Sequence, residues 1–165
     1  MTDKPMHRKD RQLSQEEAWQ ALAQGTHGVL CLVGEDGWPY GVPMNYVLLD
    51  GSLYLHCARS GYKLEAIARD ERVCFTVVTQ ARLIPEHITT LYESVMVLGR
   101  AHVVEHPHEH DAGLAALINT LGRVTPEIRD QYIAKKSKNT TVLRIRPLRL
   151  TGKASRQLIP VTQRM

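Results

Sequence analysis

Residues 50–63, DGSLYLHCARSGYK, contain a tight turn, a strand and a loop that leads into a helix. The pair Asp50-Gly51 is typical of a type I′ turn, because both central residues of that turn need positive φ. Behind it, apolar and polar residues alternate up to Cys57, which is the pattern of a half-buried strand. Helical spacing of apolar residues begins at Leu64. The segment therefore predicts a β-hairpin followed by a loop and a short helix over residues 64–69.

The strand behind this turn has two distinct faces, because successive side chains point to opposite sides of a strand. Leu53, Leu55 and Cys57 share one face, whereas Tyr54 and His56 share the other. We expect the leucine face to enter the core. His56 therefore points away from that part of the core.

The remaining sequence repeats the β pattern and places helices around it. Ser14 and Glu17 form the signature of a capping box and predict a helix that runs to about Ala23. Gly99, inside a long extended run, predicts a bend or a bulge. Further strand-like runs lie at residues 29–33, 40–49, 73–78, 92–104 and 141–146, and helical patterns at residues 108–121 and after Pro126.

Strands outnumber helices in this pattern and follow one another through short turns. The two hairpins within residues 29–57 adjoin along the chain and predict a meander. Such an order favours an antiparallel sheet closed into a barrel with helices packed outside, and disfavours a parallel Rossmann sheet.

The composition fits one soluble domain over residues 1–165. Hydrophobic residues make up 43% and charged residues 23% of the chain, values far from those of a disordered protein. No apolar run reaches the roughly 20 residues that cross a bilayer, and residues 1–11 are charged, so we expect a cytoplasmic protein without a membrane partner. Cys31, Cys57 and Cys74 form no C-x-x-C pair and are expected to be reduced residues of the core.

The net charge of +4 favours an anionic ligand. Nucleic acid is disfavoured as that ligand, because the basic residues are scattered and the aromatic residues, 5% of the chain, form no stacking motif.

The loop after the predicted strand has the features of a phosphate-binding cradle. Ser60 can donate a hydrogen bond, Arg59 and Lys63 carry positive charge, and the start of the following helix presents backbone N–H groups. Solvated cations at a helix entrance would show the same residues, so both interpretations stay open. The sequence contains no Walker lysine motif and no G-x-S-x-G elbow, which leaves nucleotide hydrolysis and serine hydrolysis without support.

Six segments in the same order resemble the pyridoxamine-phosphate-oxidase-like flavoproteins, with the nitroimidazole-resistance branch the most similar. These segments are GWPYGVPMNY at residues 37–46, HCARSGYK at 56–63, VCFTV at 73–77, RKDR at 8–11, YESVMVLGRA at 92–101 and LTGK at 150–153.

This resemblance implies a mainly β fold, a six-stranded antiparallel split β-barrel of Greek-key type with peripheral helices. It also implies a homodimer with flavin mononucleotide (FMN) at the subunit interface. The termini, residues 1–12 and 154–165, would then be flexible or contact the partner. By the same resemblance, Arg59, Ser60 and Lys63 hold the phosphate, Pro43, Met44, Asn45 and Tyr46 lie along the isoalloxazine ring, His56 lies near the ribityl chain or ring edge, and Tyr92 and Ser94 approach from the partner.

Several of these residues also have a purely structural interpretation. Asn45 could be an amide at a strand edge that satisfies backbone groups, and His56 a buried, hydrogen-bonded histidine. Tyr46 and Tyr54 could be core aromatics that reach a polar group with their hydroxyls.

One segment departs from the family pattern. His106, His108 and His110, together with His102, gather where related proteins carry an acidic residue followed by lysine. Imidazoles and carboxylates bind Zn²⁺ or Ni²⁺. The spacing favours a solvated loop, and we expect no metal site.

We therefore expect a flavin-dependent oxidoreductase in which FMN passes electrons to a small organic acceptor and NADH or NADPH is the donor. Protons would come from His56, a tyrosine hydroxyl or water. The alternative is a protein that holds FMN or haem without turnover.

Overall fold

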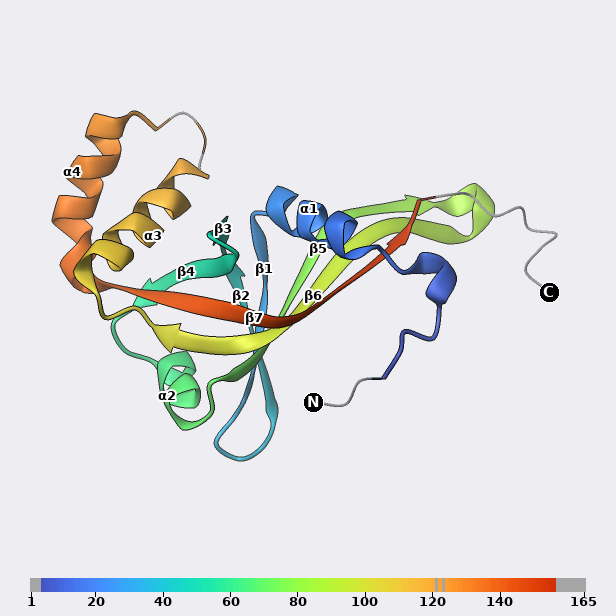
Figure 1. The fold of residues 1–165 in the computed structure, drawn as a ribbon, viewed down its shortest axis with the longest axis horizontal. Helices are drawn as coiled ribbons and strands as arrows, with labels where there is room; N and C mark the ends of the chain where they lie inside the picture. Colours follow the sequence, from blue (N-terminus) through green and yellow to red (C-terminus); the bar gives the residue numbers. More distant parts are fainter. Residues whose placement is uncertain (1–3, 121, 123, 157–165) are drawn as a thin grey trace.

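A single curled sheet of seven antiparallel strands forms the body of the molecule in the computed structural model, which describes residues 4–120, 122 and 124–156 (Figure 1). The strands lie in the order β2-β1-β5-β6-β7-β4-β3. Their bounds are β1 (His27–Val33), β2 (Pro39–Asn45), β3 (Val47–Leu49), β4 (Ser52–Ala58), β5 (Arg72–Ile84), β6 (Thr89–Val103) and β7 (Thr140–Ser155). The predicted mainly β fold is confirmed, with one strand more than expected.

The helices lie outside the sheet (Figure 1). They are α1 (Gln15–Gln24), α2 (Tyr62–Arg69), α3 (Pro107–Asn119) and α4 (Pro126–Lys136), with 3₁₀ turns η1 (Lys9–Arg11), η2 (Pro85–His87) and η3 (Ser137–Asn139). No helix among the described residues is long and apolar enough to cross a bilayer.

The predicted meander is wrong, because the two hairpins occupy opposite edges of the sheet. The β1–β2 pair forms one edge and the β3–β4 pair forms the other. The extended run at residues 40–49 is divided at Tyr46, whose backbone N–H donates to the carbonyl of Thr26. The chain crosses the open side of the half-barrel at this point, and β2 consequently contacts β4 across the curl.

The predicted turn and bulge are present. Asp50 and Gly51 have φ values of 48° and 70°, as a type I′ turn requires. At Gly99 the register of β6 against β7 shifts, and a Cβ there would lie 2.5 Å from the carbonyl oxygen of Arg146. The bulge therefore depends on the missing side chain.

The main core lies between the concave face of the sheet and α1. Leu30, Phe75 and Val97 are fully buried and come from adjacent strands. Helix α1 contributes Ala18 and Leu22 to the same cluster.

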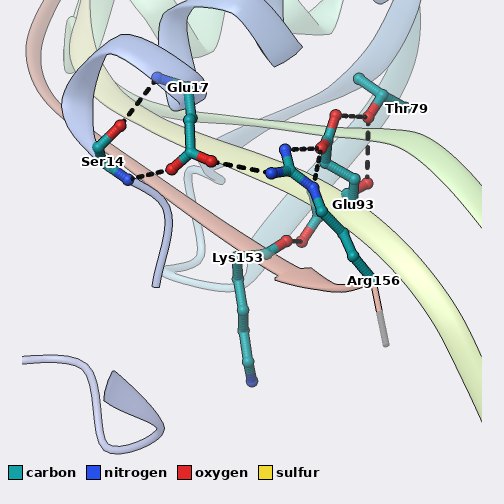
Figure 2. A network of polar contacts seen from close by, with 7 residues as sticks. Ser14, Glu17, Thr79, Glu93, Lys153 and Arg156 are labelled. Carbon is teal, nitrogen blue, oxygen red and sulfur yellow. Dashed lines mark hydrogen bonds and ion pairs between the residues drawn. The ribbon is translucent and has the colours of Figure 1, made fainter. Parts of the chain in front are cut away.

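A polar network ties α1 to the far ends of β6 and β7 (Figure 2). The capping box predicted for Ser14 and Glu17 is present, with each side chain bonded to the other residue's backbone N–H. The guanidinium of Arg156 donates to Glu17 at 2.8 Å and to Glu93 at 2.5 Å. Glu93 is only 6% exposed, and the Thr79 hydroxyl donates a further hydrogen bond to its carboxylate at 3.0 Å. The buried carboxylate is thus paired and hydrogen-bonded, as a buried charge must be.

A second, smaller core lies under α3. Leu114 and Ile118 pack against Tyr54 and Val142 on the convex side of β4 and β7. Glu109 fixes the helix here by accepting from the Tyr54 hydroxyl at 2.9 Å and from Arg144 at 2.8 Å. Tyr54 is therefore a core residue with a satisfied hydroxyl.

Strand β5 extends well beyond its predicted run, whereas β6 begins only three residues before its own, and the two form a two-stranded arm (Figure 1). The sequence does not reveal this extension, because the residues after Val78 have little contact with the core and so need no regular alternation of polar and apolar residues. A bulge between Val78 and Gln80 marks the base of the arm.

Residues 1–3 and 157–165 of the predicted termini lie outside the described residues. Near the described parts of both termini the chain is tied to β7: Gln12 forms a bridge with Lys153, and the backbone N–H of Leu13 donates to the carbonyl of Gly152 at 3.0 Å. Strand β7 runs to Ser155.

Candidate functional site

An open cavity of about 550 Å³ lies at the point where β1, β2, β4 and the start of α2 meet. It is lined by His27, Val42, Pro43, Met44, Asn45, His56, Cys57, Ala58 and Lys63. Five of the predicted site residues are among them, namely Pro43, Met44, Asn45, His56 and Lys63.

The register of the first hairpin explains one wall of this cavity, which we call the flavin-type cavity after the ligand expected from the sequence. Asn45 pairs with His27, and Pro43 pairs with Val29, so the end of β2 lies beside the start of β1. Alternation leaves Pro43 and Asn45 exposed and turns Met44 inward, where it joins the main core. Met44 therefore shapes the wall mainly from behind.

The opposite wall comes from β4 and α2. His56 lies on the exposed side of β4, as the alternation predicted. Lys63 lies in the first turn of α2, where backbone N–H groups have no acceptor within the helix. An ammonium group and a positive helix end therefore face the same end of the cavity.

The loop between β4 and α2 is held in place from outside the cavity. Gly61 has a φ of 133°, a conformation that L side chains rarely adopt. The hydroxyl of Tyr62 accepts a hydrogen bond from the backbone N–H of Glu35 at 2.8 Å, and its ring packs edge-on against Tyr40 with centroids 5.0 Å apart. These contacts fix the start of α2 against the β1–β2 hairpin.

Arg59 and Ser60 are exposed beside the cavity and do not line it. The guanidinium of Arg59 donates to the carbonyl of Lys138 at 2.8 Å, which directs it toward η3. Lys63 is thus the cation that the structure brings to the cavity from this loop.

Tyr46, which the resemblance places along the flavin ring, does not line this cavity. Tyr46 is fully buried, its hydroxyl donates to the carbonyl of Leu22, and its ring packs edge-on against Phe75. Burial raises the pKa of its hydroxyl, so the group stays neutral. These contacts favour the core interpretation of Tyr46, which lies where the chain crosses between the two sheet edges.

Tyr92 and Ser94 lie on β6, away from the cavity that holds the other predicted residues. The Arg11 guanidinium lies 6.0 Å from the centroid of the Tyr92 ring, and the Ser94 hydroxyl donates to the carbonyl of Lys153 at 3.4 Å. Both side chains share the face of β6 that carries Met96.

That face of the sheet is partly apolar and open. Val29, Val78 and Met96 are 37%, 54% and 44% exposed. The pairings of Thr76 with Val29 and with Met96 place Val29, Thr76 and Met96 in one row across β1, β5 and β6, and Val78 lies two residues further along β5 on the same face. We call Val29, Thr76, Val78 and Met96 the outer patch. It adjoins the flavin-type cavity through the pairing of Val29 with Pro43.

The histidine-rich segment does not converge on one point. His102 lies 3.3 Å from Glu71, whereas His110 contacts the carbonyl of Thr140 at 3.0 Å. His106 and His108 are exposed at the start of α3. Within the part of the chain that the structure describes, no three histidine, cysteine or acidic side chains gather as metal ligands would.

Sequence reasoning missed part of the cavity lining, namely His27, Val42, Cys57 and Ala58. Counting back from the turn at residues 35–37 pairs His27 with Asn45, so this histidine could have been found. Burial raises the pKa of the Cys57 thiol although Lys63 opposes the shift, which leaves Cys57 a neutral thiol rather than a nucleophile.

A curled antiparallel sheet, with outer helices and a cavity where its two edges approach, defines the split-barrel class of proteins. Within that class, the sequence profile described as pyridoxamine 5'-phosphate oxidase matches residues 14–154. The chain belongs to this family. No protein of curated function matches the sequence.

Solved structures of the same fold come from several bacteria. A proposed 5-nitroimidazole antibiotic resistance protein from Bacteroides thetaiotaomicron is 23% identical with a TM-score of 0.74, over 86% of this chain and 85% of that chain. A conserved hypothetical protein from Mycobacterium tuberculosis is 22% identical with a TM-score of 0.77, and the match covers 91% of this chain and 90% of that chain. An FAD-binding protein from Mesorhizobium loti is 23% identical with a TM-score of 0.68, and the match covers 88% of this chain and 97% of that chain.

Proposed function

We propose that this protein binds FMN in the flavin-type cavity and acts as a flavin-dependent oxidoreductase on a small organic acceptor, with NADH or NADPH as donor. The observation that carries the proposal is the convergence of Pro43, Asn45, His56 and Lys63, which come from three separate elements, on one open cavity. Flavin binding by the Mesorhizobium loti protein of the same fold supports it.

The cavity offers the three environments that a flavin nucleotide needs. Lys63 and the positive end of α2 suit the phosphate, since charge-assisted hydrogen bonds are the strong ones. Val42 and Pro43 provide apolar surface for the rings. The amide of Asn45 can both donate and accept hydrogen bonds, as the pyrimidine edge of the ring system demands.

The chain itself would position the cofactor and manage protons. A bound flavin supplies the redox chemistry, and the protein supplies binding, orientation and electrostatics. His56 would hold or deliver a proton through an imidazole nitrogen, and His27 is a second histidine in the same lining. The half-buried, neutral thiol of Cys57 takes no such part.

The outer patch supports a homodimer as the working form. Exposed apolar side chains that lie together in a row indicate an interaction surface, and this row borders the cavity. A second copy seated there would complete the site with Tyr92 of the partner subunit and Ser94 of the partner subunit.

Absorption spectroscopy of the purified protein tests the proposal directly. We expect a two-band yellow flavin spectrum, or its appearance on titration with FMN, and tighter binding of FMN than of FAD. Anaerobic bleaching by NADH or NADPH, reversed by an organic acceptor, would support turnover. A protein that stays colourless with added flavin contradicts the cofactor assignment, and a bound flavin that no donor reduces contradicts the enzymatic one.

A further inference from the structure

A second cavity, of about 230 Å³, lies between α3, α4 and the sheet. Its walls are Leu114, Leu117, Ile118, Val124, Ile128 and Tyr132, and its polar groups are Asn45, His56 and Thr140. We call it the helix cavity. Asn45 and His56 line the flavin-type cavity as well, so the two cavities meet at these two side chains.

Helix α4 leaves this cavity open instead of filling it. None of its described side chains is buried, whereas α3 buries Leu114, Leu117 and Ile118. Ile128 and Tyr132 are one turn apart on α4 and line the cavity, yet they are 57% and 49% exposed. Two large apolar side chains on one helix face, turned to a cavity and left partly in water, indicate a surface for binding a ligand.

The chemistry of the helix cavity restricts its ligand. Among the described residues that line it, none is a lysine, arginine, aspartate or glutamate. A ligand charge buried here would meet no side chain of permanent opposite charge among these residues, and burying a charge without one is strongly disfavoured. The volume is below the roughly 300–1,000 Å³ of pockets for drug-sized ligands, which points to a small molecule.

We propose that the helix cavity holds the body of the acceptor substrate, and that this substrate is a small, uncharged and mainly apolar ring compound. Its hydrogen-bonding group would lie at Asn45 and His56, where the helix cavity meets the flavin-type cavity. This inference rests on the proposed function, because it assigns the acceptor side of the same site. In this arrangement the acceptor lies apart from Lys63, which would bind the FMN phosphate at the other end of the flavin-type cavity.

The test uses two probes with the same ring, neutral acetophenone and anionic benzoate, on the flavin-loaded full chain at neutral pH. Ligand-observed NMR gives the affinity of each probe. We expect acetophenone to bind about tenfold or more tightly than benzoate, because the anion finds no partner in the cavity. The flavin absorption bands should shift with acetophenone, since Asn45 and His56 are shared.

Two variants of α4 locate the binding. Ile128→Glu places a charge in the cavity wall at a half-exposed position, where the fold should tolerate it. The affinity for acetophenone should fall by about tenfold or more. Gln131→Glu adds the same charge to an exposed residue of the same helix outside the lining, and should leave the affinity unchanged. Flavin affinity should be unchanged in both variants.

The outcomes separate this inference from the proposed function. Equal binding of both probes, or full acetophenone affinity in Ile128→Glu, overturns the helix cavity as the acceptor site while flavin binding still stands. Dissociation of a dimer by Ile128→Glu also overturns it, because this face would then be a subunit contact. Failure of the wild-type chain to bind flavin overturns the proposed function and the acceptor role together.

Discussion

Lys63 is the side chain on which the proposed phosphate contact depends. One charge-assisted hydrogen bond contributes roughly 1.5–3 kcal/mol, so Lys63→Ala should weaken FMN binding by about 10- to 150-fold. Fluorescence titration with FMN measures the loss. Lys135→Ala removes an exposed lysine of α4 and is the matched control.

Arg59→Ala should weaken FMN binding less than Lys63→Ala does, because the Arg59 guanidinium is already hydrogen-bonded to the carbonyl of Lys138. Equal dissociation constants for Lys63→Ala and Lys135→Ala would contradict the assignment of the phosphate to the start of α2.

Tyr46 separates the core interpretation from the ligand interpretation of the same residue. Tyr46→Phe removes a buried hydroxyl that donates to the carbonyl of Leu22, and should lower the free energy of unfolding by about 1 kcal/mol. Urea denaturation measures this loss. FMN affinity should stay at the wild-type value. A variant of unchanged stability that loses FMN would show instead that the ring contacts the cofactor.

At the scale of elements, the cap of α1 makes stability depend on pH. The backbone N–H of Ser14, and then the Arg156 guanidinium, hold the pKa of Glu17 below its usual 4.5. Because the folded-state pKa is depressed, this stabilisation is present above 4.5 and is lost as the pH falls through the folded value. Wild type should therefore lose more thermal stability on acidification below that pH than Glu17→Gln, which keeps an acceptor for Ser14. Parallel Tm profiles of the two proteins would contradict this.

The elements could be predicted from sequence where the cause is local. The Ser14 capping box, the Asp50-Gly51 turn and the Gly99 bulge each follow from the conformational needs of a few adjacent residues. The crossing at Tyr46 could not be predicted, because a hairpin pattern does not say which other hairpin it will pair with. That choice depends on burial of the Tyr46 ring against Phe75, a contact between residues distant in sequence.

At the scale of the whole molecule, some features of the candidate site could be predicted from local sequence, and others depend on contacts between distant residues. The loop cation Lys63 and the outward-facing His56 followed from the strand and helix pattern. The meeting of His56 with Asn45 depends on the curl of the sheet, which brings β2 to β4. The helix cavity could not be predicted from the sequence at all. It is the space left between α3, α4 and the sheet, because no described side chain of α4 is buried there.

The proposed pairing of two chains belongs to this scale as well, and the outer patch makes it testable. Met96→Glu places a charge in the row between Thr76 and Thr151 and should convert a dimer to a monomer. FMN affinity should fall at the same time, because Tyr92 of the partner subunit would be lost from the site. Sedimentation and FMN titration of the same sample measure both effects.

Val103→Glu is the matched control, since Val103 lies on the same strand and is 45% exposed against 44% for Met96. It lies beyond the Gly99 bulge, outside the outer patch, and should keep both the dimer and the flavin. A Met96→Glu protein that stays dimeric would place the subunit contact elsewhere. A Met96→Glu monomer with full FMN affinity would show that one chain completes the cofactor site, because burial of the outer patch and binding of the flavin would then be independent.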